Sequence, residues 1–374
     1  MYKYITLLFA ISILSGCGDK TATDKEESTA SSAMSSSSDT TTAPDLKYPL
    51  ERHFKNVKQL TFGGDNAEAY FSFDNSKLVF QSNNKAWGLH CDQIFYMNLT
   101  DDLRKGQPKM LSTGKGRTTC SYFMPGDSLI LYASTHEGGE DCPPEPPRDN
   151  KKYVWPIYST FDIYVADLNG NIVKKLTDFD GYDAEATVSP QGDKIVFTSM
   201  RSGDLELYTM DIDGSNVKQI THELGYDGGA FFSPDGKRLV FRSSRPKTPE
   251  AIKEYKDLLA KNLVQPTNME IYTVNVDGTD LKQITHLGKA NWAPYFHPSG
   301  KKIIFSSNHA GKRGFEFNLY MINEDGTGLE RISGDGVFDA FPMFSYDGKY
   351  LVFSSNRNNG GTHDTNMFLA EWVD

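Results

Sequence analysis

From residue 57 onward, short apolar runs alternate with polar turns in one recurring order. The order is a strand ending in Leu/Ile-Thr, a loop, a strand ending in Phe-Ser-Pro-Asp-Gly, a strand Val-Phe-x-Ser, a variable loop, and a strand such as Leu-Tyr-x-Met followed by Asp-Gly. The clearest copy covers residues 229–285. Alternation of apolar and polar residues is typical of half-buried strands. Each repeat is therefore predicted to be a four-stranded antiparallel sheet.

The turn in the middle of each repeat has a physical basis. Pro presets φ, Asp caps the turn, and Gly takes the positive φ of a tight hairpin. Hairpins of this kind begin at Ser72-Phe73-Asp74, Pro125-Gly126-Asp127, Ser189-Pro190-Gln191, Ser233-Pro234-Asp235, His297-Pro298-Ser299 and Ser345-Tyr346-Asp347. Radial packing in a closed ring covers the faces and protects the edges of such sheets. The sequence thus predicts an all-β fold, a six-bladed β-propeller.

The two ends of the repeat array are complementary. The last repeat stops after its third strand, at residues 366–373, and the first Leu-Thr strand, residues 57–61, precedes any sheet of its own. We therefore expect residues 57–61 to pair with the last blade as its outer strand and to close the ring.

Residues 57–374 resemble the WD40-like (PD40) repeats of the TolB family of β-propellers. The resemblance implies the fold and leaves the function open. The chain departs from TolB itself, which is soluble and carries an α/β domain ahead of its propeller. Residues 18–56 are too short and too polar for such a domain, and they contain no counterpart of the segment through which TolB contacts its inner-membrane partner.

The N-terminus has the features of an export signal. Lys3 is followed by an apolar run, Ile5–Leu14, that is too short for a permanent membrane span, and then by Leu14-Ser15-Gly16-Cys17. This ending resembles the lipobox of bacterial lipoproteins, which implies lipidation of Cys17; a plain signal peptide is the alternative. We expect residues 1–17 to be the signal, residues 18–45 a disordered Ser/Thr-rich tether, and residues 46–374 the propeller. Gly18 is compatible with transport to the outer membrane.

Charge and cysteine content narrow the chemistry. The net charge of -10 argues against nucleic-acid binding, which requires a basic face. In an oxidising compartment, Cys91, Cys120 and Cys142 should form one disulfide and leave one free thiol. We expect Cys142 to pair with Cys91 or with Cys120. A metal site that also uses His90 and His136 is the alternative, but its spacing matches no zinc signature, so we predict no metal and no cofactor.

Long insertions should gather on one face of the ring. They fall between the second and third strands of their repeats, at residues 134–160, 246–268, 308–317 and 356–365. Long loops on one face of a rigid scaffold mark a working face. The insertion at 246–268 predicts a helix with Thr248 as N-cap and Pro249 at its first position. This helix is expected to pack on its blade, or else to bind a partner.

Two columns of polar residues recur across the repeats and should meet on this face. The first column, at the start of the inner strand, is Asn66, Thr118, Asp183, Asp227, Asn291 and Asp339. The second, after the second strand, is Asn84, His136, Arg201, Arg245, His309 and Arg357. Either the columns pair with each other and fix the loops, or they form a polar funnel for a charged peptide or glycan end. Glu68 and Glu185 lie one step deeper, where they could bind a ligand, serve as acid and base, or bond to neighbouring backbone.

Three classes of function fit these features. The first is a non-catalytic, monomeric lipoprotein that binds a protein, peptide or glycan partner of the envelope, which could be associated with peptidoglycan. The second is an enzyme of the polysaccharide lyase or glycosidase type. The third is an accessory propeller for a separate peptidase, since the sequence contains neither Gly-x-Ser-x-Gly nor His-Glu-x-x-His. We favour the binding role.

Overall fold

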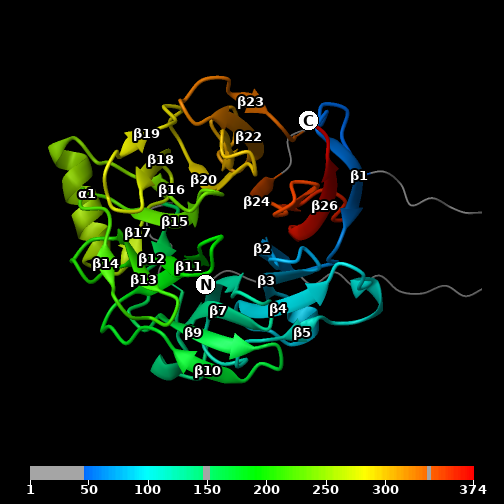
Figure 1. Cartoon of the computed structure of the whole chain (residues 1–374), viewed down its shortest axis with the longest axis horizontal. Coiled ribbons are helices and arrows are strands. Elements are labelled where there is room, and N and C mark those ends of the chain that lie inside the picture. Colours follow the sequence, from blue (N-terminus) through cyan, green and yellow to red (C-terminus); the bar gives the residue numbers. More distant parts are fainter. Residues whose placement is uncertain (1–45, 146–151, 335–337) are drawn as a thin grey trace, which may run out of the picture. The chain divides into compact units, whose positions relative to one another are not determined.

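Six four-stranded antiparallel sheets stand around a common axis, as Figure 1 shows. The computed structural model describes residues 46–145, 152–334 and 338–374. The predicted six-bladed propeller is therefore confirmed. The predicted signal, with Cys17, and the predicted tether lie outside the described residues. Within the described part of the chain, no helix is long and apolar enough to cross a membrane.

Strands follow one another from the axis outward in every blade. Blades 1 to 3 consist of β2 (Asp65–Phe71), β3 (Lys77–Asn83), β4 (Gln93–Asn98) and β5 (Lys109–Met110); β6 (Thr118–Phe123), β7 (Leu129–Ser134), β9 (Asp162–Asp167) and β10 (Ile172–Lys175); and β11 (Asp183–Val188), β12 (Lys194–Ser199), β13 (Glu206–Asp211) and β14 (Lys218–Gln219). Blades 4 and 5 consist of β15 (Asp227–Phe232), β16 (Arg238–Ser243), β18 (Glu270–Asn275) and β19 (Lys282–Gln283); and β20 (Asn291–Phe296), β21 (Lys302–Ser307), β22 (Asn318–Asn323) and β23 (Glu330–Arg331).

Blade 6 joins the two ends of the described chain. It consists of β24 (Asp339–Phe344), β25 (Tyr350–Ser355), β26 (Asn366–Trp372) and, as its outer strand, β1 (Phe54–Gln59). In register, Lys58 pairs with Leu369, and the amide of Leu60 donates to the carbonyl of Met367 at 2.8 Å. The blue β1 and the red β26 lie side by side in Figure 1. The predicted closure is thus confirmed, and the closing strand starts at Phe54.

The second strand of each blade is buried more completely than the repeat pattern suggests. In β12, every residue from Ile195 to Ser199 is buried, although alternation predicted one exposed face. That expectation was wrong for the second strands because neighbouring blades cover both faces of the sheet at this radius. The side chains between blades form a continuous apolar core that includes Phe80, Ile130, Phe197 and Phe305.

A buried ion cluster fixes the segment ahead of β1 to blade 6. The Arg357 guanidinium donates to the Glu51 carboxylate at 2.6 and 3.1 Å and to Asp339 at 3.1 Å. It lies over the rings of Tyr48 and Phe353, with centroid distances of 4.6 and 4.9 Å. Only 2% of Arg357 is exposed, and Glu51 is fully buried. Ring closure therefore involves side chains that precede the closing strand.

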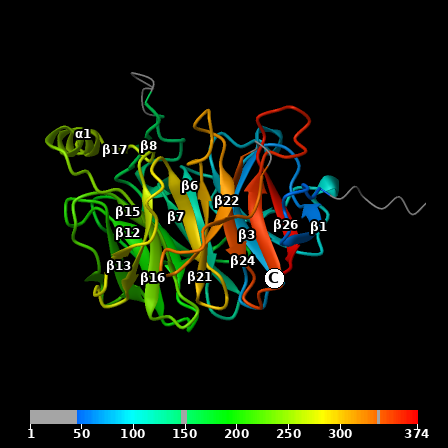
Figure 2. The same ribbon diagram turned by 90° about the horizontal axis from the view of Figure 1, so that it is seen from above.

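Two long insertions meet on one face of the ring. The helix α1 (Pro249–Leu259) begins with Thr248 as N-cap, whose side chain accepts a hydrogen bond from the amide of Ala251, as predicted. After it, β17 (Leu263–Val264) pairs with β8 (Trp155–Pro156) from the insertion of blade 2. Figure 2 shows α1, β17 and β8 on the same side of the ring. We call this side the loop face.

Candidate functional site

A β-bulge interrupts the inner strand of every blade at the same position. Between the first and second strands, the register shifts once in each blade. Each shift holds one residue with positive φ: Glu68 (53°), Cys120 (46°), Glu185 (58°), Gly229 (61°), Ala293 (47°) and Phe341 (54°). All six line one small space near the axis. The bulges therefore present these six residues, which we call the bulge ring, to the central channel.

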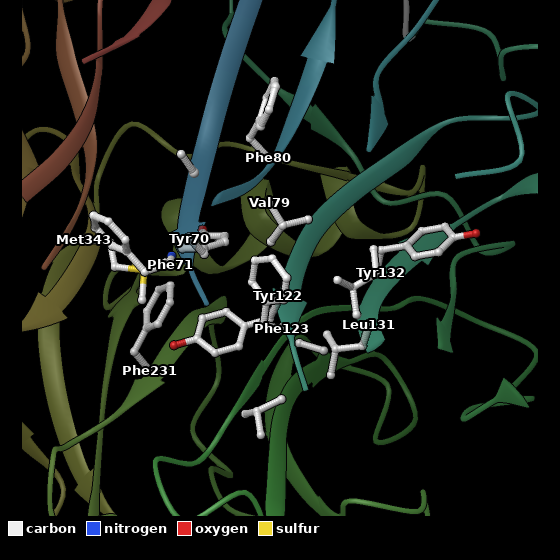
Figure 3. Close-up of a cluster of buried hydrophobic side chains, with 14 of the residues drawn as sticks. Tyr70, Phe71, Val79, Phe80, Tyr122, Phe123, Leu131, Tyr132, Phe231 and Met343 are labelled. Carbon is white, nitrogen blue, oxygen red and sulfur yellow. Dashed lines mark hydrogen bonds between the residues drawn. The ribbon is translucent and has the colours of Figure 1, made fainter. Parts of the chain in front are cut away.

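Aromatic side chains fill the channel on the side of the bulge ring away from the loop face. These residues come later on the inner strands than the bulge ring, so they lie farther from the loops that enter those strands. The centroid of the Tyr70 ring lies 5.5 Å from those of Tyr122 and Phe231, and Phe231 lies 5.2 Å from Tyr295. Figure 3 shows Tyr70, Tyr122 and Phe231 converging among buried neighbours such as Met343. The channel is thus filled on this side.

A cavity of about 840 Å³ lies between the bulge ring and the loop face, within the size range of about 300–1,000 Å³ typical of small-molecule sites. Its polar side comes mainly from blades 1 and 2: Asp65, Asn66, Glu68, Gln81, Asp92, Arg117, Thr118, Thr119 and Cys120. Its aromatic side includes Tyr153, Trp155, Phe161, Tyr226, Trp292, Phe315, Phe317, Phe338 and Phe341. The cavity is therefore amphipathic.

Arg242 and Glu185 form a buried pair at the bottom of the cavity. The Arg242 guanidinium donates to Glu185 and, at 2.6 Å, to the hydroxyl oxygen of Tyr226. Glu185 also accepts from Tyr226 (2.6 Å), from Thr198 (2.8 Å) and from the amide of Gly229 (2.8 Å). The guanidinium lies near the rings of Trp155 and Tyr226, 5.3 and 5.2 Å from their centroids. These contacts fix both charged groups in place.

Glu68 lies beside this pair and differs from it. Its Oε2 is shielded from solvent and has no hydrogen-bond partner among the described residues, as is also true of Nε of Arg242. Burial raises the pKa of Glu68 from its ordinary value of 4.5 to about 7, against the opposing effects of the Cys120 thiol and the Arg242 guanidinium. A buried acceptor and a buried donor near the cavity floor thus have no hydrogen-bond partner within the described protein.

The insertion of blade 2 carries Trp155 across the loop face. A disulfide joins Cys91 to Cys142 at the start of this insertion, which is one of the two predicted pairings, and Cys120 is the free thiol. At the far end, the amide of Ile157 donates to the carbonyl of Asn262 at 2.7 Å, next to the β8–β17 pair. Trp155 then packs against Trp292 of blade 5, with centroids 5.1 Å apart.

The two predicted columns of polar residues are brought together within single blades. Asp183 accepts from Arg201 at 2.5 Å, Asp227 accepts from Arg245 at 2.5 and 2.8 Å, and Asp339 accepts from Arg357 at 3.1 Å. The carboxylate residues are fully buried. None of these three arginines is among the described residues that line the cavity. Their contacts are those of the structural alternative, and a ligand-binding role for them stays a prediction.

The remaining column positions bond to serines or backbone. Asn66 and Asn291 accept from Ser82 and Ser307, at 2.9 and 2.6 Å. His136 and His309 bond to the serine two residues before each of them, at 2.9 Å. Of the predicted ligand-binding residues, Asn66, Glu68 and Glu185 line the cavity. Within the part of the chain that the structure describes, no group of His, Cys, Asp and Glu is placed to hold a metal ion.

Sequence reasoning missed Arg242 and the aromatic side of the cavity. Arg242 occupies the variable position of the Val-Phe-x-Ser strand, where the other repeats carry Gln81, Ala133, Thr198, Ser306 and Ser354. Several of these side chains bond to the bulge ring: Thr198 to Glu185, and Gln81 to the amide of Cys120. An arginine in a column of small or polar residues was the available signal. Trp155 lies in an insertion and Trp292 lies near the start of a strand, so the repeat pattern carried no signal for either residue.

Comparisons with known proteins agree with this architecture. A sequence profile of the TolB beta propeller domain matches residues 153–256, and no curated protein matches the sequence. A putative TolB from Agrobacterium tumefaciens is similar in structure, with 20% identity and a TM-score of 0.53 over 83% of this chain and 91% of that chain. An oligogalacturonate lyase from Vibrio parahaemolyticus has 11% identity and a TM-score of 0.50 over 84% of this chain and 93% of that chain.

TolB from Acinetobacter baumannii has 21% identity and a TM-score of 0.49 over 83% of this chain and 64% of that chain. At these identities a structural likeness shows the fold alone. The chain is a six-bladed β-propeller, and its residues 153–256 match the profile of the TolB beta propeller domain.

Proposed function

We propose that this chain is a non-catalytic binding lipoprotein of the bacterial cell envelope, anchored through Cys17 by way of a tether at residues 18–45. Its ligand would be one end of an envelope glycan or peptide, taken up in the cavity on the loop face. The observation that carries the proposal is the cavity itself: about 840 Å³, with an aromatic side and a polar side. Preformed sites of this kind favour binding because little reorganisation is needed.

The fold does not choose between binding and catalysis, because the similar structures include a lyase as well as TolB proteins. The contacts of the carboxylates favour binding over glycoside hydrolysis. Acid–base cleavage of a glycoside needs two carboxyl groups free to act on the substrate. Glu185 instead accepts hydrogen bonds from Thr198, Tyr226, Gly229 and Arg242. Glu68 is therefore the one carboxyl group of the bulge ring that is not held in place by several hydrogen bonds, and it has no second carboxyl group of the ring to act with it.

The test is a pulldown from envelope extract with the full, detergent-solubilised chain. Tyr153 and Phe315 are 55% and 59% exposed and line the cavity, so Tyr153→Ala and Phe315→Ala should reduce capture of the partner without harming the fold. Phe62 is the matched control, because it is an aromatic residue 39% exposed in the loop that enters β2 and lies outside the cavity lining. Equal capture by all three variants would contradict the proposed site.

Turnover would contradict the non-catalytic part of the proposal. Incubation of the full chain with envelope glycans and peptides should release no new reducing ends and no new amino termini. A product that the wild-type chain forms and the Glu68→Gln variant does not form would make the chain an enzyme.

A further inference from the structure

The bulge ring divides the channel into a polar half and an apolar half. Blades 1 to 3 contribute Glu68, Cys120 and Glu185, and blades 4 to 6 contribute Gly229, Ala293 and Phe341. The cavity above also has a polar side, mainly from blades 1 and 2, and an aromatic side to which blades 2, 4, 5 and 6 contribute. A ligand that fits must therefore present an apolar face on one side and hydrogen-bonding groups on the other.

The apolar side is a continuous aromatic surface. The Trp292 ring stacks on Phe317 at 4.3 Å between centroids, and Phe317 lies 5.6 Å from Phe338. Trp155 extends this surface at 5.1 Å from Trp292. The negative faces of aromatic rings attract weakly positive C–H groups. A saccharide ring offers such C–H groups on its faces and hydroxyl groups around its edge.

The arginines that line the cavity are already paired. Arg117 donates to Asp92 at 3.2 Å and also to Glu145. Arg313, at the rim, donates to Glu316 at 2.7 and 2.9 Å. With Arg242 bound to Glu185, every cavity-lining arginine in the described part of the chain has a carboxylate partner. A carboxylate on the ligand would thus find no guanidinium without a carboxylate partner, and of the solvent-shielded guanidinium nitrogens only the Nε atoms of Arg117 and Arg242 lack an acceptor among the described residues.

The charged form is less well stabilised in the carboxyl groups on the polar side of the cavity. Burial raises the pKa of Glu68 and of Asp92, and burial together with Asp364 raises the pKa of Asp65. Oε2 of Glu68 lacks a donor and Nε of Arg242 lacks an acceptor among the described residues. A hydroxyl group both donates and accepts, so hydroxyls of one ligand can satisfy both atoms.

We propose, on the basis of the binding role proposed above, that the cavity binds a saccharide without carboxylate groups. One sugar ring packs on Trp155 and Trp292, and its hydroxyls bond to Glu68 and Arg242. Uronic acids are disfavoured, because their carboxylate would approach the carboxyl groups of Asp65, Glu68 and Asp92. Like charges at close range in a partly desolvated site reduce affinity strongly.

The experiment is a titration of the full, detergent-solubilised chain followed by tryptophan fluorescence, since two of its four tryptophans line the cavity. The probes are tetramers of N-acetylglucosamine, glucose and galacturonate. We expect at least one of the first two to bind at least tenfold more tightly than the galacturonate tetramer. Trp292→Phe should keep binding with a smaller fluorescence change, Trp292→Ala should weaken binding at least tenfold, and Phe62→Ala should leave the affinity unchanged.

Glu68→Gln separates charge from packing. It should bring the affinities for the neutral and the acidic tetramers closer together, whereas a merely structural role would lower both equally. Tightest binding of the galacturonate tetramer would overturn the saccharide class proposed here and leave the binding role intact. The saccharide class also fails, and the binding role again stays intact, if no tetramer binds while capture of a pulldown partner depends on Tyr153 and Phe315. If neither a tetramer nor a pulldown partner depends on cavity residues, the binding role fails as well.

Discussion

Replacement of Arg357 by Met should weaken ring closure strongly. The guanidinium is the shared partner of Glu51 and Asp339, and all three side chains are at most 1% exposed. Met keeps an unbranched apolar stem but has no charge, so the variant leaves two carboxylates buried without a cation. Removal of one partner from a buried ion pair costs about 3–5 kcal/mol. We expect Arg357→Met to lower the free energy of unfolding by that amount.

The measurement is urea unfolding followed by tryptophan fluorescence. Arg52→Met is the matched control, because Arg52 belongs to the same N-terminal segment and pairs with Glu330, but 73% of its side chain is exposed. Exposed pairs contribute about 0–1 kcal/mol, so the control should unfold near the wild-type midpoint. Glu51→Gln combined with Arg357→Met should cost less than the sum of the two single changes, since they remove one interaction.

A small and equal effect of Arg357→Met and Arg52→Met would refute this reasoning. It would mean that the pairing of β1 with β26 holds the ring closed by itself and that the buried cluster adds nothing to stability.

Three further changes act at the cavity. The pKa of Glu68 is about 7 in the folded state and 4.5 in the unfolded state, so the free energy of unfolding should fall by about 3 kcal/mol as the pH rises through this range. Urea unfolding at pH 5 and pH 8 should show this fall for the wild type but not for Glu68→Gln. Cys91→Ser should destabilise by up to about 4 kcal/mol, because the disulfide with Cys142 closes a loop with a sequence separation of 51. Gly229→Ala should cost about 2 kcal/mol or more, since φ is +61° and the new Cβ would collide with Arg242.

The first two of these changes share one control variant, Cys120→Ser. Glu68 faces Cys120, Arg242, Glu185 and Asp92. Because Cys120→Ser keeps a hydrogen-bond donor beside Glu68 and does not touch the disulfide, this variant should keep the pH dependence and the stability of the wild type. A pH profile of Glu68→Gln parallel to that of the wild type, or equal loss of stability from Cys91→Ser and Cys120→Ser, would contradict the corresponding expectation. For Gly229→Ala, an unchanged midpoint would show that Arg242 moves away without cost.

The sequence was sufficient to predict the blades, the closing strand and the helix. Repeated turns and strands are local features, and Thr248 with Pro249 is a local start signal for α1. Closure of the ring could be predicted because the last repeat stops after its third strand and the strand at residues 57–61 has no sheet of its own. The cysteine pairing could be narrowed only to two candidates, because the choice between Cys91 and Cys120 depends on how far the insertion reaches.

The interior of the site could not be predicted, for a different physical reason. A β-bulge depends on the pairing of two strands and leaves no fixed residue type behind, as the variety in the bulge ring shows. The Arg242–Glu185 pair joins two blades, and Glu51 lies ahead of the recognisable repeats. Contacts between different repeats therefore cannot be predicted from an alignment of the repeats with each other.

The bulge ring also explains how one scaffold can carry different ligand chemistry. Positive φ costs a non-glycine residue about 1–2 kcal/mol, and five of the six ring positions bear this cost. The strand pairing on both sides of each bulge imposes the backbone, so the side chain at the bulge contributes little to it. Its identity then depends on the neighbouring side chains and on what the channel holds: Gly229 leaves room for Arg242, and Glu185 pairs with Arg242. The division into Glu68, Cys120 and Glu185 against Gly229, Ala293 and Phe341 therefore reflects both the packing around Arg242 and the amphipathic ligand proposed above, because the backbone is alike in all six blades.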